Sequence, residues 1–403
     1  MTRHHRLEVA DVFREHAAEY LVAHGATAAQ RRVLRAIQNC RTAALGGHVE
    51  ACDRCGHQRI AYNSCRNRHC PKCQGPACAR WMQARAAELL PVPYFHLVFT
   101  LPRVLGPLAL QNPRVLYGLL LQAAAQTLLT VAANPKHLGA KIGFLAVLHT
   151  WGQNLLHHPH VHCVVPAGGL SPDGMRWIAC RPGFLLPVRV LSRVFRGKFM
   201  HGLKRAFARG ELAFHGQLVE LAAAEQFEQL LDQAVRHDWV VYAKRPFGGP
   251  DSVLKYLARY THRVAISNRR LVSLRNKEVT FRWKDYAHGG RQRTMRLAAT
   301  EFIRRFMLHV LPSGFMKIRH YGFMANRFRS TKRELCLRLL KLFMAPPPVI
   351  EEHNPNDLPP NGDCESMARP CPHCQQGRLR IVLRILPQLS GRSGPAATYF
   401  DTS

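Results

Sequence analysis

Acidic residues are scarce in this chain of 403 residues, which has 25 Asp and Glu against 57 Lys and Arg and a formal net charge of +32. A field of this sign favours a polyanionic partner, because neutralising phosphates releases counterions and drives binding. A membrane surface would also attract the charge, but stable attachment needs an anchor or a long basic amphipathic helix. We therefore expect nucleic acid to be the principal partner.

Long uninterrupted apolar runs are also missing. The longest candidate, LYGLLLQAAAQTLLTVAA at 116–133, is broken by Gln122 and Gln126 and is expected to be a buried helix rather than a membrane span. The start, MTRHHRLEVADVFREH, lacks the apolar core of a secretory signal. We expect a cytoplasmic, nucleoid-associated bacterial protein without membrane attachment. In that setting the 13 cysteines favour thiolate and metal chemistry over disulfides.

The remaining pattern predicts a folded α+β protein, because 47% of the residues are hydrophobic and only 20% are charged. Helices are expected over 6–45, 188–236, 251–265 and 300–344, strands over 94–102, 143–151, 160–166 and 238–244, and a β-meander over 269–297. APPPVIEEHNPNDLPPNGD at 345–363 holds six prolines and is expected to be an extended linker. The predicted domains are a helical region 1–47, a zinc-binding domain 48–90, a catalytic domain 91–344, and a linker and tail 345–403.

Aliphatic residues are few between 48 and 80, where cysteines supply the alternative to a hydrophobic core. Cys52 and Cys55, and then Cys70 and Cys73, form two chelating pairs separated by fourteen residues, which is close to the spacing of four-cysteine zinc sites. The sequence therefore predicts structural Zn²⁺, with unliganded cysteines as the alternative. Other residues nearby leave room for a second ion or a three-plus-one arrangement: Cys65, Cys78, His48, His57 and His69.

Basic residues lie between these cysteines and predict either a DNA-contacting surface or a solvated face: Arg54, Arg59, Arg66, Arg68 and Lys72. In the tail, Cys371 and Cys374 form half of a zinc site. Cys364 or His373 would be needed to extend it, and an unbound tail is equally open.

The segment HHPHVHC at 157–163 is the densest group of histidines in the chain. On a strand, His160 and His162 face one side and Val161 and Cys163 the other, so the two imidazoles can converge on one divalent ion. The alternative is a pair of histidines packed on a half-buried sheet.

The predicted helix at 251–265 separates two faces. Taking about 100° per residue, Tyr256 and Tyr260 lie about 40° apart, with Arg259 and Arg263 beside them, whereas the aliphatic residues occupy the other face. A tyrosine hydroxyl is a weak nucleophile at its usual pKa of about 10, and neighbouring cations favour the phenolate and hold a phosphate. We interpret Tyr256 and Tyr260 as candidate nucleophiles and Arg259 and Arg263 as candidate DNA-binding residues.

These motifs resemble a known family. HPHVHCVVPAGGL at 158–170 is similar to the metal motif of HUH single-strand nucleases, and YLARYTHRVAISNRRL at 256–271 is similar to the tyrosine helix of the rolling-circle transposases of the insertion sequence 91 family. YNSCRNRHCPKCQ at 62–74 and LPSGFMKIRHYGF at 311–323 also resemble segments of that family. The resemblance covers residues 10–340 in the same order.

The resemblance implies an HUH nuclease core whose central antiparallel sheet is flanked by helices. His160 and His162 would bind catalytic Mg²⁺ or Mn²⁺, with a third ligand among His149, Gln153 and His158. Tyr256 or Tyr260 would attack single-stranded DNA at the ends of the mobile element and form a 5′-phosphotyrosine, so cleavage and rejoining need no ATP. Some relatives use one tyrosine, which leaves the role of the second open.

Two other functions share part of this pattern. A zinc-containing DNA-binding regulator without catalysis would account for the charge and the cysteines, but it would need neither the histidine pair nor the polar-face tyrosines. A relaxase or replication initiator of HUH type would share the core chemistry and differ from a transposase in its cognate DNA.

Overall fold

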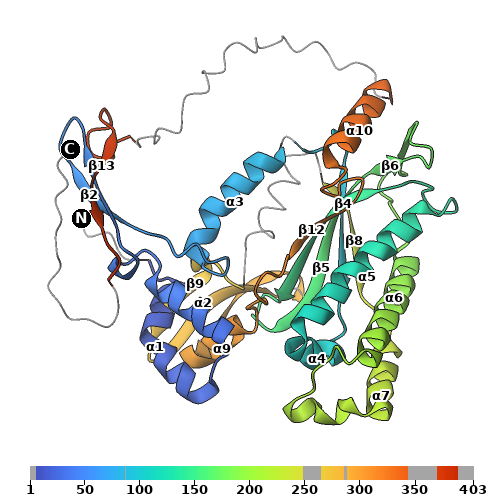
Figure 1. Cartoon of the computed structure of the whole chain (residues 1–403), viewed down its shortest axis with the longest axis horizontal. Helices are drawn as coiled ribbons and strands as arrows, with labels where there is room; N and C mark the ends of the chain where they lie inside the picture. Colours follow the sequence, from blue (N-terminus) through green and yellow to red (C-terminus); the bar gives the residue numbers. More distant parts are fainter. Residues whose placement is uncertain (1–5, 87, 248–264, 286–287, 344–369, 389–403) are drawn as a thin grey trace.

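A computed structural model describes residues 6–86, 88–247, 265–285, 288–343 and 370–388. Its centre is a five-stranded antiparallel sheet, which confirms the predicted α+β class (Figure 1). The strands of this sheet, in spatial order, are β12 (Ile318–Gly322), β4 (Gly143–Trp151), β5 (His157–Pro166), β3 (Tyr94–Thr100) and β8 (Val241–Phe247). The strands expected over 94–102, 143–151 and 160–166 are confirmed, and the fourth begins at residue 241 instead of 238.

Strand alternation in β5 positions the histidines as the sequence predicted. Val161, Cys163 and Val165 are buried in the main hydrophobic core, beneath helices on one face of the sheet. Those helices are α4 (Gly106–Gln111), α5 (Pro113–Ala133), α6 (Val188–Ala208) and α7 (Ala224–Val235). The other face of β5 therefore carries His160 and His162 away from this core.

Helix α5 is the apolar segment discussed above. It is long and apolar enough to cross a membrane, but 61% of its most apolar window is buried in the protein. Its buried side chains, including Leu120, Leu121 and Leu128, belong to the main core, and the helix packs on α6, β4 and β5. The prediction of a buried core helix is confirmed.

A second hydrophobic core joins the first helices of the chain to a segment more than 200 residues later. Helices α1 (Val9–His24) and α2 (Ala28–Asn39) pack with α9 (Ala299–Met307) beside a meander of β9 (Leu271–Arg275), β10 (Glu278–Asp285) and β11 (Arg291–Ala298). The meander was predicted. Phe13 of α1 meets Phe306 of α9 edge to face, with ring centroids 5.2 Å apart.

The interpretation of 300–344 as continuous helix is wrong. Between α9 and α10 (Arg329–Phe343), residues 318–322 form edge strand β12 on β4. Gly322 ends this strand with φ +61°, and a Cβ there would stand 1.8 Å from the carbonyl oxygen of Ile142. The positive φ and this close approach both require glycine at the end of β12.

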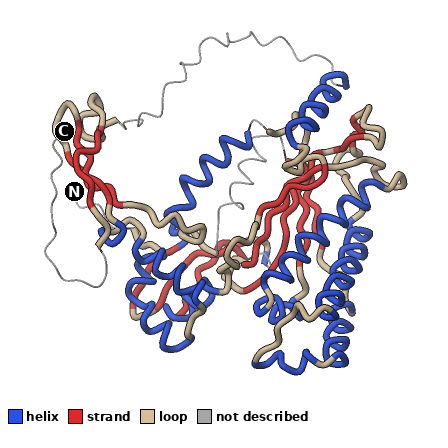
Figure 2. The backbone as a smooth tube through the Cα atoms, in the orientation of Figure 1, coloured by secondary structure: helices blue, strands red, loops and turns tan. Residues whose placement is uncertain are grey.

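The remaining strands and helix α3 were not predicted from the sequence, and they include a small sheet at one end of the molecule (Figure 2). β1 (Gly47–Cys52) and β2 (Gln58–Tyr62) form a three-stranded sheet with β13 (Leu379–Ile385), a strand of the tail. The linker expected over 345–363 lies within 344–369, outside the described residues. The other elements are α3 (Pro71–Ala86), β6 (Gly168–Leu170), β7 (Trp177–Ala179), and 3₁₀ turns at Ala43–Leu45, Arg103–Leu105, Gly216–Ala222 and Asn268–Arg270.

The second core generates a stability prediction. Phe13→Ala and Phe306→Ala should each lower the free energy of unfolding by about 3–5 kcal/mol, because both rings are fully buried. The double variant should lose less than the sum, by about 0.5–1.5 kcal/mol, since the two rings contact each other. Denaturant unfolding measures these changes. Val22→Ala on the same helix, with Val22 91% exposed, is the control; equal losses in the control would contradict the assignment of the core.

Candidate functional site

Three histidines meet on the face of the central sheet that lies opposite the main core. His149 of β4 is directly opposite His160 of β5 in the strand register, and His162 lies two residues further along the same face. One ring nitrogen from each of the three lies within 4.8 Å of the other two, and all three residues belong to a group able to hold a metal ion. Of the three candidates for a third ligand, the structure therefore groups His149 with the predicted pair.

Neighbouring groups fix the orientation of two of these rings. Nδ1 of His160 lies 2.6 Å from the carbonyl oxygen of His158 and donates to it, and Nδ1 of His162 lies 2.7 Å from Nε2 of His96 on β3. Histidines that bind metals usually engage their second nitrogen in this way. Trp151 stacks on His149 with ring centroids 4.4 Å apart, which holds the third ring.

Burial keeps His160, His162 and the neighbouring His96 uncharged. Desolvation lowers the pKa of His160 to about 4 and the pKa of His96 to about 3, and it holds the pKa of His162 well below the ordinary value. At neutral pH these rings are therefore neutral. The neutral imidazole is the form that binds a metal ion, so the donor chemistry and the geometry fit a divalent ion.

The histidines line a cleft of about 820 Å³ between the central sheet and the meander. Its walls are basic and aromatic: Lys244, Arg269, Arg270, Arg282, Lys284, Trp151, Trp283 and Tyr242. Arg270 is held in place by its contacts with the carbonyl oxygens of Arg282 and Gln153. Positive charge with aromatic rings is the combination that binds the backbone and bases of a single-stranded nucleic acid.

Tyr256, Tyr260, Arg259 and Arg263 lie in 248–264, outside the described residues. The chain re-enters the described part at Ala265, which lines the same cleft as the histidines. The roles of the two tyrosines and the two arginines stay predictions.

The cysteines form two groups, and the predicted pairing of them is wrong. Cys70 and Cys73 lie with Cys40 and Cys65, whereas Cys52 and Cys55 lie with the tail residues Cys371 and Cys374. The two N-terminal pairs thus belong to different groups instead of one. The reason is that Cys40, at the end of α2, and Cys65, in the loop before α3, complete one set locally, while strand β13 delivers the tail pair to the other.

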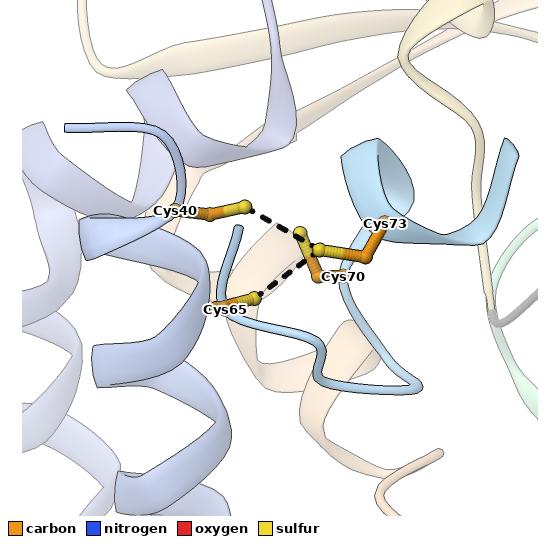
Figure 3. Close-up of side chains that lie close together, drawn as sticks. All are labelled: Cys40, Cys65, Cys70 and Cys73. Atoms are coloured by element: carbon orange, nitrogen blue, oxygen red, sulfur yellow. Dashed lines mark hydrogen bonds between the residues drawn. The ribbon is translucent and has the colours of Figure 1, made fainter. Parts of the chain in front are cut away.

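The first group brings four sulfur atoms together from three parts of the chain (Figure 3). The Sγ atoms of Cys40 and Cys65 each lie 3.5 Å from Sγ of Cys73. A hydrogen bond from Cys65 lowers the pKa of Cys40 to about 2, and the same contact raises the pKa of Cys65 to about 12. A cation among the sulfurs would let all four become thiolates, so this group also fits a metal ion.

Several of the basic residues between the cysteines have structural roles. Arg68 donates to the carbonyl oxygens of Pro312 and Phe315, Arg59 pairs with Glu50, and Lys72 pairs with Glu8. These contacts within the protein account for three of the five basic side chains that predicted a DNA-contacting surface.

Sequence reasoning missed three contributors. His96 was hidden in the apolar strand YFHLVFT, although a histidine among residues that alternate into a core is itself a signal. Cys40 follows an amphipathic helix, 12 residues before the first chelating pair. Lys244 lies opposite His96 in the register of β3 and β8, which no local pattern reveals.

Comparison with known proteins agrees with this arrangement. Residues 12–101 match a family described as "Transposase zinc-binding domain", and residues 143–332 match one described as "Putative transposase". The first span contains six of the eight grouped cysteines, and the second contains His149, His160 and His162.

Two relatives extend the match over most of the chain. "Putative transposase y4qJ" of Sinorhizobium fredii (strain NBRC 101917 / NGR234) is 55% identical over 399 residues, which cover 98% of each chain. "Transposase for insertion sequence element IS801" of Pseudomonas savastanoi pv. phaseolicola is 30% identical over 295 residues, 72% of this chain and 68% of the relative. No solved structure matches. With both families matched in order and a relative aligned end to end, the chain belongs to the insertion sequence 91 family of transposases.

Proposed function

We propose that this transposase cleaves and rejoins single-stranded DNA at the ends of its own mobile element, in rolling-circle transposition, through a 5′-phosphotyrosine intermediate. The observation that carries the proposal is the group of three imidazoles in the basic and aromatic cleft. A regulator that only bound DNA would need the charge of the cleft but not three converging histidines. The reaction would take place in the bacterial cytoplasm, on the nucleoid.

The histidine group would hold the catalytic ion. We assign His149, His160 and His162 as its ligands, because their nitrogens converge and burial keeps two of the three rings neutral. A bound Mg²⁺ or Mn²⁺ would supply Lewis acidity and neutralise charge on the phosphate. Oxygen atoms of the DNA phosphate suit such an ion and would complete its coordination.

His96 acts as a positioning residue in this proposal. Its contact with Nδ1 of His162 fixes the ring of that ligand and leads us to assign Nε2 of His162 as the coordinating atom. The carbonyl of His158 does the same for His160. Both ligands would then coordinate the ion through Nε2, and each ring is already held in one orientation.

The nucleophile would be Tyr256 or Tyr260, as the family resemblance implies. Its phenol loses a proton, the oxygen attacks phosphorus, and the bond from phosphorus to the 3′ oxygen breaks. The 3′ oxygen takes a proton and leaves as a hydroxyl, while the 5′ phosphate remains on tyrosine. Rejoining reverses these steps with another 3′ hydroxyl, so the phosphotyrosine bond conserves the free energy of the original one. Arg259 and Arg263 would hold the phosphate.

The walls of the cleft would hold the strand. Lys244, Arg269 and Lys284 would neutralise phosphates, and Trp151 and Trp283 would offer faces on which unpaired bases stack. Duplex DNA cannot present unstacked bases to such rings. This wall chemistry therefore supports single-stranded ends as the substrate.

The metal assignment predicts the behaviour of three variants. His149→Ala, His160→Ala and His162→Ala should each lower single-strand cleavage by more than about 100-fold, since loss of a ligand costs more than loss of an outer-shell partner. Binding of the same DNA should persist, because the basic walls are intact. Gel assays of cleavage and filter binding measure both. His201→Ala, on the exposed side of α6, is the matched control; wild-type cleavage by all three ligand variants would refute the metal site.

The positioning role of His96 has a separate signature. His96→Phe should raise the Mn²⁺ concentration for half-maximal cleavage by about 10–100-fold, and excess Mn²⁺ should restore much of the rate. His96→Gln keeps a hydrogen-bonding group, so it should raise the Mn²⁺ concentration for half-maximal cleavage by less than His96→Phe does. A titration with Mn²⁺ distinguishes this from a purely structural role, which would reduce the rate equally at every metal concentration.

The tyrosine assignment is tested by trapping the intermediate. Labelled single-stranded DNA from the flanks of the element, incubated with Mn²⁺, should give a covalent adduct that survives denaturation. Tyr256→Phe combined with Tyr260→Phe should abolish the adduct, and each single substitution should impair transposition. Tyr62→Phe, on strand β2 outside the cleft, should keep the adduct. An adduct that persists in the double variant would overturn the assignment.

A further inference from the structure

The tail of the chain returns to its N-terminal region and pairs with it. Strand β13 lies antiparallel to β1, with partners running from Gly47 and Ile385 to Cys52 and Leu379. Figure 1 shows β13 beside β1 and β2, far from the end of α10. This pairing brings Cys371 and Cys374 next to Cys52 and Cys55.

The two cysteine pairs lie in similar turns, the second of which is one residue longer than the first. The amide of Cys52 donates to the carbonyl of His57 at 2.9 Å, and the amide of Cys371 donates to the carbonyl of Gly377 at 2.8 Å. The residue after each pair donates back to the first cysteine, Gly56 to Cys52 at 3.1 Å and Gln375 to Cys371 at 2.9 Å. Both of these residues have positive φ, +69° and +58°. Each Cys-x-x-Cys segment thus forms a turn that ends in a residue with positive φ and closes with a backbone hydrogen bond to its first cysteine.

The sulfur atoms have the spacing of a tetrahedral thiolate site. Sγ of Cys52 lies 3.7 Å from Sγ of Cys374, and Sγ of Cys55 lies 3.7 Å from Sγ of Cys371. Four sulfurs about 2.3 Å from one zinc ion stand about 3.8 Å apart when the angles are tetrahedral. Both observed separations are close to this value and far from the length of a disulfide.

Backbone amides point at the sulfurs from both turns. The amide of Arg54 lies 3.4 Å from Sγ of Cys52, and the amide of Gly377 lies 3.3 Å from Sγ of Cys374. Such donors stabilise thiolates. Gly377 is needed for the approach of the two turns, because a Cβ there would stand 2.4 Å from Sγ of Cys52.

Little else holds this sheet together. Its buried cluster consists of Cys52, Cys371 and Leu379, with Cys374 packed against it. Apolar side chains on the strands are exposed instead, with Ile60 at 57% and Val382 at 58%. A three-stranded sheet with so small a core needs another source of stability, and a bound metal is the usual one in small domains.

We propose that Cys52, Cys55, Cys371 and Cys374 bind one Zn²⁺ and that this ion joins the two ends of the chain in a split zinc ribbon. The ion would be distinct from the one held by the first group of cysteines. The family match for the zinc-binding domain ends at residue 101, so the tail ligands lie outside it. Asp53 reinforces the junction, since its carboxylate accepts from the amide of Arg378 at 2.8 Å and pairs with Arg380.

The test is the zinc content of the purified full-length protein, measured by mass spectrometry of the metal. All variants carry His160→Ala and His162→Ala, which removes the histidine site from the count and makes the result independent of the proposed nuclease function. The parent should hold two zinc ions per chain. The variant with both Cys371→Ser and Cys374→Ser should hold one zinc ion per chain. The control variant Cys180→Ser changes a cysteine outside both groups and should hold two zinc ions. A tail variant with the same zinc content as its parent would overturn the proposal.

A second measurement guards against loss of zinc through misfolding. A protease site placed in the proline-rich segment 345–363 allows the tail to be cut from the otherwise unchanged protein. The tail fragment should stay with the body during gel filtration and should be released by a chelator strong enough to remove zinc. Separation of the fragment from the untreated, zinc-loaded protein would contradict the proposal.

Discussion

The antiparallel pairing of β4 with β5 is the constraint on which the proposed chemistry depends. Its register sets His149 opposite His160, and strand alternation adds His162 on the same face while Val161 and Cys163 enter the main core. A slip of one residue would exchange the two faces, bury imidazoles among leucines and expose valines. The apolar core beneath the sheet therefore fixes the position of the polar group above it. The layer of α5 and α6, which supplies much of that core, lies on the opposite face of the sheet from the site.

A second constraint operates where apolar residues are few. Residues 48–80 contain few aliphatic side chains, and two groups of four cysteines compensate. The first group packs within the second hydrophobic core, and the second group forms most of the small cluster of the tail sheet. Each group collects its members across the sequence, from helix α2 to α3 in one case and across more than 300 residues in the other. Metal binding, on our account, closes the chain on itself and holds the tail beside the N-terminal sheet. The transposase thus combines a site organised by hydrophobic packing with an N-terminal region and a tail organised by cysteines.

The sequence predicted what depends on local pattern. The strands around His160, the meander over 269–297, the buried helix α5 and the separation of the two faces of β5 all follow from periodicity within a single segment. The pairing of cysteines did not, because spacing alone suggested one site for Cys52 and Cys73, whereas the partners come from Cys40 and from a tail strand. His96 was missed for the same reason, since its role arises from the pairing of β3 with β5. Strand β12 was read as helix, because its sequence lies between two helical segments and only its place beside β4 makes it a strand.

The central claim is that His149, His160 and His162 bind one divalent ion on the central sheet. Crystals of the full-length protein soaked in Mn²⁺ and measured near the manganese absorption edge test it most directly. The account predicts an anomalous peak at bonding distance from one nitrogen of each of the three rings. A peak elsewhere in the cleft, or a well-ordered histidine group with no peak at saturating Mn²⁺, would contradict it.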